Sequence, residues 1–468
     1  MNKKMKPMSG RIGRLAGFTA GVALTAILIS PAAFAESLEE ALASAYQNNP
    51  TLLAERASLR ATDEGVATAL SGWRPTVQID GDAGFSESET TSVTSGFTTT
   101  TTKDSLQPRS FSFSITEPLY RGGRTQAETQ SAENLVDSGR AGLAETEQRV
   151  LLDAVTAYMD VLSNHTVVQL NRNNERVVER QLQAARDRFE VGEVTRTDVA
   201  QAEARVAQAK ADRIGAEGDL ISSRATYRQV VGDLPGKLEW PASIGGVPAN
   251  ERDALQAAST ANPTIVSANF AELAARDDID VATSDLLPQV SLRGAYDRSY
   301  DVSAFTEESD SLSISAVVTV PLYQSGAEHS AVRRSKQVAS QRRLEYEEAR
   351  RAIFEEVTRA WESLITAQAQ ITAFHSQVRA AELALEGVEQ ETLVGLRTTL
   401  DVLDAEQEVF AARVNLVSAE RDAVVSSYWV KATMGELTAG ALELPVERYD
   451  ADAHYRSVRD KWFGLSPD

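Results

Sequence analysis

The chain has 468 residues, contains no cysteine and carries a formal net charge of -20 at pH 7. The lack of cysteine excludes disulfides, thiolate nucleophiles and cysteine-based metal sites. The acidic balance also argues against nucleic acid as a partner, because that binding needs clustered Lys and Arg to neutralise phosphates.

The first 35 residues predict a cleaved secretory signal peptide. Lys and Arg residues precede an apolar run over residues 15–29, and Ala33 and Ala35 then form an Ala-x-Ala cleavage site. A membrane-spanning anchor is the alternative, but this run is short for a helix that crosses a bilayer. We therefore expect an exported protein.

The exported part contains an internal duplication. Residues 48–81 align without a gap with residues 261–294 at an offset of 213, and the offset becomes 203 from the Pro-Leu-Tyr motifs onward. The first copy is therefore 10 residues longer between Gly81 and Pro118. We expect a first structural repeat over residues 36–250, a second over 251–440 and a tail over 441–468.

Alternation of apolar and polar residues predicts one β-hairpin in each copy, at about residues 74–118 and about residues 288–321. Strands of about ten residues have the length that a tilted strand needs to cross a bilayer. The alternative is an edge hairpin of a soluble β-domain. Four strands cannot close a barrel alone, so we expect them to pair with strands of other chains. The tip of the first hairpin, residues 86–105, is rich in Ser and Thr and predicts a mobile, solvated loop.

The same Pro-Leu-Tyr-x-x-Gly motif follows each hairpin. A proline can end a strand ladder because it lacks an N–H, a tyrosine suits the bilayer interface, and a glycine lets the chain turn into a helix. We expect the motif to join strand to helix through Pro118, Tyr120, Gly123, Pro321, Tyr323 and Gly326.

Very long helices are predicted next, because no proline occurs over residues 119–234 or 322–444, which are rich in good helix formers. A helix from Gly123 to about Glu190 would be on the order of 100 Å long. One apolar stripe with helical spacing in the first copy, and its counterparts in the second, comprises Leu151, Val155, Tyr158, Leu162, Phe354, Trp361 and Ile365.

The long helices end in two similar turns, at residues 190–197 and 393–398, where a glycine precedes a Thr or Asp that starts the next helix. We expect tight turns between antiparallel helices. Arg397, Asp401 and Asp404 place two carboxylates on one helix face. If this face met its own copies about a symmetry axis, a ring of acidic groups would form.

No catalytic motif or phosphate-binding loop is present, so we expect neither an enzyme nor a cofactor. The four histidines, at positions 165, 329, 375 and 454, are not at metal-ligand spacing. We expect them to be incidental residues on helix surfaces.

Taken together, these motifs resemble the TolC family of outer-membrane efflux and secretion channels. The resemblance implies a TolC-like mixed α/β fold and a homotrimer at the outer membrane of a Gram-negative bacterium, extending into the periplasm. Each protomer would give four strands to a shared 12-stranded barrel in outer-membrane lipid. Its helices would form a periplasmic tunnel with an equatorial belt near residues 232–250 and after Glu436.

The resemblance also implies a transport role, a set of gate residues and a docking site for an adaptor protein. It would be the passive exit duct of tripartite efflux pumps or a type I secretion system, opened by a periplasmic adaptor and an inner-membrane RND or ABC transporter. Its periplasmic gate would use Asp401, Asp404, Arg397, Thr197 and Asp198, and Thr392 stands where a family member has a tyrosine. The adaptor would dock on turns containing Val191, Gly192, Val394 and Gly395. Crowded carboxylates at the aperture would raise one another's pKa and attract cations.

The main alternative is an exported structural coiled coil, such as an adhesin or spacer, without a channel. It explains the helices but has no use for amphipathic hairpins at matched places in both copies. An adaptor protein is disfavoured because it carries one helical hairpin, whereas this chain has two.

Overall fold

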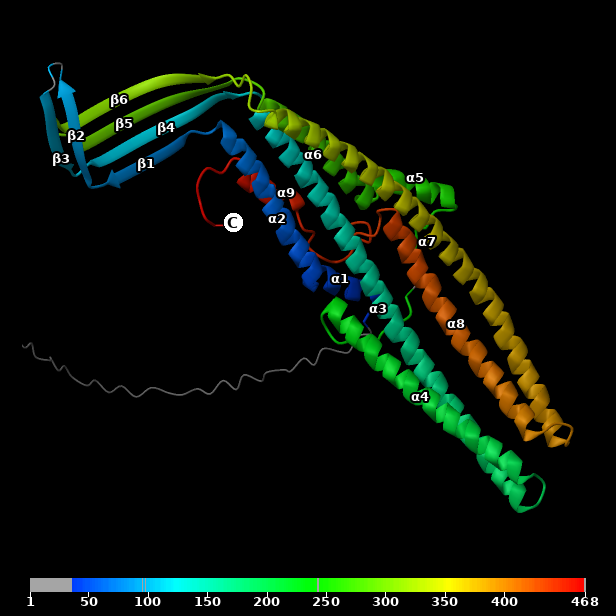
Figure 1. Ribbon diagram of the computed structural model, residues 1–468. Helices are drawn as coiled ribbons and strands as arrows, with labels where there is room; N and C mark the ends of the chain where they lie inside the picture. Colours follow the sequence, from blue (N-terminus) through cyan, green and yellow to red (C-terminus); the bar gives the residue numbers. More distant parts are fainter. Residues whose placement is uncertain (1–35, 95, 97, 242–243, 467–468) are drawn as a thin grey trace, which may run out of the picture.

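The computed structural model describes residues 36–94, 96, 98–241 and 244–466. The predicted signal peptide and its cleavage site lie outside these residues. A four-stranded sheet lies at one end of two helices of 67 residues each, and the turns that follow these helices lie at the far end (Figure 1). At about 1.5 Å per residue, each long helix extends roughly 100 Å, as predicted.

The same series of elements occurs twice along the chain. The first series is α1 (Leu38–Asn48), α2 (Pro50–Leu70), the short η1 (Ser71–Trp73), β1 (Thr76–Ala83), β2 (Ser86–Thr94), β3 (Thr98–Leu106), β4 (Arg109–Arg121), α3 (Arg124–Glu190) and α4 (Arg196–Val231). The second is α5 (Glu251–Ala261), α6 (Pro263–Ser284), β5 (Gln289–Ser303), β6 (Thr306–Thr319), α7 (Ala327–Leu393) and α8 (Thr399–Thr433), followed by α9 (Ala451–Val458).

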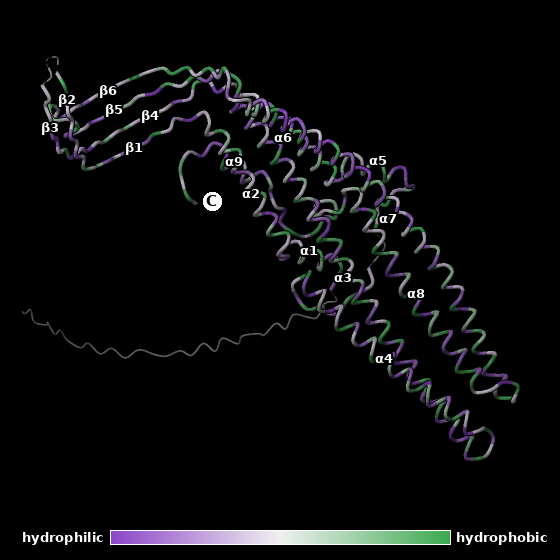
Figure 2. The backbone as a smooth tube through the Cα atoms, in the orientation of Figure 1, coloured by the Kyte–Doolittle hydropathy of each residue, from purple (hydrophilic) through white to green (hydrophobic). Residues whose placement is uncertain are grey.

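The sheet is antiparallel throughout, in the order β1-β4-β5-β6, so the β4–β5 pair joins the two series. Residues directly opposite one another share a face, and apolar and polar residues alternate along the strands (Figure 2). One face carries Val77, Ile79, Phe111, Phe113, Ile115, Tyr296, Leu312, Ile314 and Val318. The other face carries Asp80, Ser112, Ser114, Asp297, Ser311 and Ser313.

The predicted loop at the tip of the first hairpin is instead a second, two-stranded sheet formed by β2 and β3. The prediction of a mobile loop is wrong because threonine is β-branched and favours extended backbone, and opposed threonines such as Thr91 and Thr101 pair across the ribbon. Their hydroxyl oxygens are 3.2 Å apart, and a Lys103–Glu89 ion pair of 3.3 Å adds a further cross-strand contact.

The junctions between strand and helix follow the predicted motif with one exception. Gly123 and Gly326 have φ angles of 84° and 82°, and each precedes the first residue of a long helix. Pro321 follows the end of β6, but Pro118 does not end β4, which continues to Arg121. The pairing register shifts between Pro118 and Tyr120, and this bulge accommodates a residue that cannot donate to the ladder.

An asparagine at the start of α2, and another at the start of α6, links that helix to the end of a helix later in the chain. The Asn49 side chain accepts a hydrogen bond from the Thr51 N–H (2.9 Å), and its amide donates to the Val230 carbonyl (2.9 Å) near the end of α4. Asn262 makes the equivalent contacts between α6 and the end of α8. Each asparagine therefore caps one helix and ties it to the end of another.

The helical core confirms the predicted apolar stripe in α3, where Leu151, Val155, Tyr158 and Leu162 are buried. In α7 the buried stripe is displaced by one residue and comprises Ile353, Val357, Ala360 and Leu364. Ile365, at the predicted place, is 43% exposed. One residue turns a helix face by about 100°, so α3 and α7 present different faces to their neighbours within the chain.

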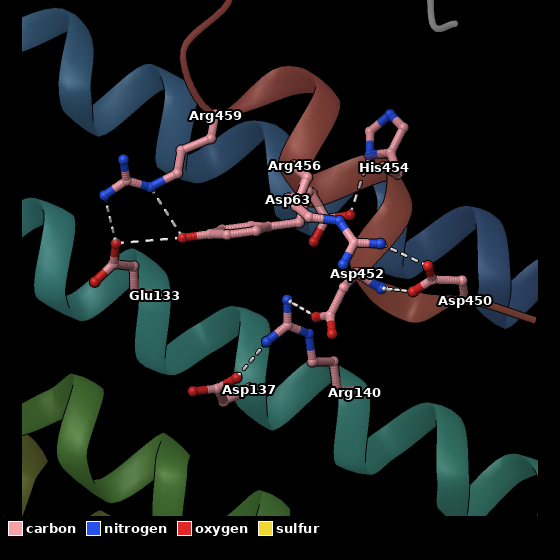
Figure 3. Close-up of polar contacts among 10 residues, drawn as sticks. Asp63, Glu133, Asp137, Arg140, Asp450, Asp452, His454, Arg456 and Arg459 are labelled. Atoms are coloured by element: carbon pink, nitrogen blue, oxygen red, sulfur yellow. Dashed lines mark hydrogen bonds and ion pairs between the residues drawn. The ribbon is translucent and has the colours of Figure 1, made fainter.

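His454 is not the incidental surface residue that we expected. It lies on α9, which packs beside α2, and its Nδ1 is 3.0 Å from Oδ2 of the fully buried Asp63 (Figure 3). Burial raises the pKa of Asp63, and the contact with His454 opposes that shift.

Among the described residues, none of the helices combines the length and the apolar character that crossing a membrane requires.

A glycine after α8 gives a direct test of this packing. Gly435 has a φ of 85°, and a Cβ atom there would lie 2.4 Å from the Ala261 carbonyl oxygen. We expect Gly435→Ala to lower the free energy of unfolding by about 2 kcal/mol or more through strain and overlap. The control, Gly387→Ala in α7, has open space around it and should leave stability unchanged or raise it by up to about 1 kcal/mol. Equal thermal midpoints for the two variants would contradict this packing.

Candidate gate at the helical tip

Two similar turns close the helical hairpins at the end far from the sheet. Gly192 follows α3 with a φ of 82°, and Gly395 follows α7 with a φ of 78°. The positive φ lets the next N–H reach back, so that Glu193 donates to the Arg188 carbonyl at 2.9 Å. The second turn has the equivalent bond at the same distance. These are the tight turns expected from the sequence.

A threonine and an aspartate begin each return helix as a capping box. Thr398 accepts a hydrogen bond from the Asp401 N–H at 3.3 Å, and the Asp401 carboxylate accepts from both the Thr398 N–H and its hydroxyl at 2.8 Å. Thr195 and Asp198 form the same box at the start of α4. Thr197 takes no part in this capping box, because the cap position is Thr195.

Asp401 is accordingly held in its charged form within one chain. Hydrogen bonds from Thr398 lower its pKa, and Arg397 acts in the same direction with its Nη1 at 3.9 Å. The raised pKa expected of crowded carboxylates concerns an aperture shared by several copies and stays a prediction. Arg397 donates its shorter bond to Glu391 at 2.9 Å, on the preceding helix of the same hairpin.

Asp404 is bound by an arginine that the sequence did not point to. Arg205 of α4 donates to its carboxylate at 2.6 Å, across 199 positions of the chain. The neighbouring Leu403 is buried and packs against Val178, Ala185 and Ala202 of the first hairpin. Leu403 and Asp404 therefore join the two hairpins close to their tips. No local spacing signals this contact, because the two residues lie in different repeats.

The turns themselves present apolar side chains to solvent. Val191 and Val394 are 72% and 70% exposed, and Leu393 and Leu396 are equally exposed. Thr392, which stands where a family member has a tyrosine, donates its hydroxyl hydrogen bond to the Val388 carbonyl of its own helix at 2.7 Å. Within one chain it makes no link to the other hairpin.

Nothing at the tip is arranged to hold a metal ion. In the part of the chain that the structure describes, no group of three or more His, Asp or Glu side chains has a geometry suited to a metal.

Comparison with known proteins gives a consistent result over most of the chain. The model of a family described as outer membrane efflux protein matches residues 41–233 and 254–436. The outer membrane efflux protein BepC of Brucella suis is 37% identical over 445 residues, which cover 94% of this chain and 95% of BepC. The outer membrane protein TolC of Vibrio cholerae is 29% identical over 420 residues, which cover 88% and 93%. The crystal structure of the Campylobacter jejuni CmeC outer membrane channel superposes with a TM-score of 0.75 at 15% identity, covering 90% and 89%.

The capping boxes allow the two threonines of the first turn to be distinguished. We expect Thr195→Ala to accelerate amide hydrogen exchange at the start of α4 by about two- to thirty-fold, corresponding to an N-cap worth about 0.5–2 kcal/mol. Thr197→Ala is the matched control, since Thr197 makes no side-chain hydrogen bond in the described structure. Faster exchange in the Thr197 variant alone would contradict the assignment.

Proposed function

The chain belongs to the TolC family of outer membrane efflux proteins, and from this premise we propose that three copies of it assemble into one channel. The protein is an outer-membrane channel, related to channel proteins rather than to enzymes. The number of copies, the gate residues and the partners are what we propose here.

The observation that carries the proposal is the two-faced sheet with open edges. In the described residues, the outer edges of β1 and β6 have no strand partner. Unpaired backbone groups are costly in hydrocarbon, so strands in a bilayer must close into a barrel. Three copies would supply twelve strands, with the apolar face toward lipid and the Ser- and Asp-bearing face toward a water-filled interior.

The long helices would continue this interior into the periplasm. α3 and α7 begin directly at the junction glycines, so each strand pair is connected to a helix of about 100 Å. Three copies would surround one tunnel. An adhesin or spacer would not need an apolar sheet face, which is why the structural coiled coil is the poorer alternative.

The gate would lie where the hairpin tips of three copies approach the axis. We assign the acidic constriction to Asp401 and Asp404, with Arg397 and the Thr-Asp caps around it. Both carboxylates have partners within the chain: Asp401 accepts hydrogen bonds in the capping box, and Asp404 is paired with Arg205. Arg205 would release Asp404 when the two hairpins separate.

The energy for transport would come from partners. We propose that a periplasmic adaptor docks on the exposed apolar turns at Val191–Gly192 and Val394–Gly395, and that an inner-membrane RND or ABC transporter drives the cargo. Exposed valines and leucines at the tip support a protein contact there, since exposed apolar patches mark interaction sites.

Blockade by multivalent cations tests the proposed channel and its aperture together. In planar bilayers the protein should form pores that hexaamminecobalt(III) blocks from the periplasmic side. We expect Asp404→Ala to weaken the block by about tenfold or more, because three carboxylates leave the constriction at once. Asp404→Ala leaves the capping box intact, and Glu193→Ala serves as a control that removes an exposed acidic residue from the first turn without altering a capping box. Pores with equal block in both variants would contradict the gate assignment, and absence of pores would contradict the channel.

The tie between the hairpins predicts a change in gating. An exposed ion pair contributes about 0.2–1 kcal/mol, so we expect Arg205→Ala to raise the open probability of the pore by up to about fivefold. Arg413→Ala is the matched control, because Arg413 binds Glu382 at 2.6 Å within one hairpin. A larger effect of the control than of Arg205→Ala would contradict the role of Arg205.

A further inference from the structure

The C-terminal segment rises along the helices toward the sheet. Asp452 of α9 binds Arg140 of α3 at 2.5 Å, and seven positions later Arg459 binds Glu133 at 3.2 Å (Figure 3). Because α3 begins at Arg124 beside the sheet, the step from Arg140 to Glu133 is a step of about 10 Å toward the sheet.

The rise ends directly below the first strand. The Arg74 guanidinium donates to the Lys461 carbonyl at 2.9 Å and lies 4.9 Å from the centre of the Trp462 ring. Arg74 is two residues before Thr76, where β1 begins. The segment after α9 is therefore held at the level where the chain enters the sheet.

Large apolar side chains of this segment are exposed to solvent. Trp462, Phe463 and Leu465 are 58%, 87% and 105% exposed. Two further aromatic residues at the same junction, Trp73 and Tyr120, are also exposed. A soluble tail gains nothing from such residues, whereas tryptophan and tyrosine are enriched where a protein meets the membrane interface.

Arg and Lys side chains lie near these aromatic side chains, although the chain as a whole is acidic. Arg74, Arg121 and Lys461 lie at this junction, and Arg459 lies just below it. Arg459 pairs with Glu133 and with Asp460, and Arg121 pairs with Glu128 at 3.8 Å. Arg74 instead contacts a ring and a carbonyl. Such groups suit the phosphates of phospholipid headgroups, next to a layer that accepts aromatic rings.

We propose that residues 461–466 form an interfacial anchor that lies in the phospholipid headgroup layer of the periplasmic leaflet, beside the start of β1. Trp462, Phe463 and Leu465 enter the boundary between headgroups and acyl chains. The polar pairs of α9, including Asp63–His454, fix the anchor to α2 and α3. The anchor thereby holds the helices at a defined distance from the bilayer.

Site-directed spin labelling tests this anchor, because the chain has no cysteine of its own. Phe463→Cys carries a nitroxide in the full-length protein, reconstituted into vesicles of phosphatidylethanolamine and phosphatidylglycerol. Collision rates are measured with oxygen, which concentrates in lipid, and with a water-soluble nickel chelate. The reference is the same label at Val394→Cys, at the helical tip.

We expect the oxygen-to-nickel collision ratio at position 463 to exceed that at position 394 by about threefold or more, as for a probe at the headgroup boundary. Adding Trp462→Ala should lower the ratio at 463 toward the reference value, whereas Trp240→Ala, which removes a tryptophan of the equatorial region, should not. Equal ratios at 463 and 394 would show a tail in water and overturn the proposal. Suppressed collisions with both reagents would show a tail covered by protein, such as a second copy of the chain, and would also overturn it.

Discussion

Backbone hydrogen bonding at the two edges of the sheet is the constraint on which the rest of the molecule depends. β4 and β5 have partners on both sides, whereas β1 and β6 each have one partner in the described structure. In water, open edges could be left to solvent, but in hydrocarbon they have nothing to bond. We therefore propose that this sheet, with one apolar face and one face of Ser and Asp residues, is completed by strands of other copies.

The junctions between strands and long helices fix where the helices begin relative to the sheet. Each series passes from strand to long helix through a glycine with a positive φ, two residues after the last paired strand position in the first series and seven after it in the second. The helices therefore start at the sheet and continue without interruption for 67 residues. The displaced buried stripe of α7 shows that the two series are not interchangeable: α3 and α7 turn different faces toward the rest of the chain, so the second series leaves residues such as Ile365 exposed.

Much of this architecture could be predicted from the sequence, because helix length, strand alternation and junction glycines are local patterns. The β2–β3 ribbon was missed because polar threonines resemble a solvated loop, although their β-branched side chains favour strands. Arg205–Asp404 and Asp63–His454 could not be predicted, because their partners lie 199 and 391 positions apart and no spacing rule connects them.

Cross-linking of the sheet edges tests the central claim most directly, and the cysteine-free chain makes it specific. One cysteine is fixed on β6 and a second is moved along β1, and the membrane-embedded protein is oxidised. Closure by three copies predicts that some register gives covalent dimers and trimers and that the series stops at three. Products longer than trimers, or the absence of any intermolecular cross-link at every register, would contradict the account.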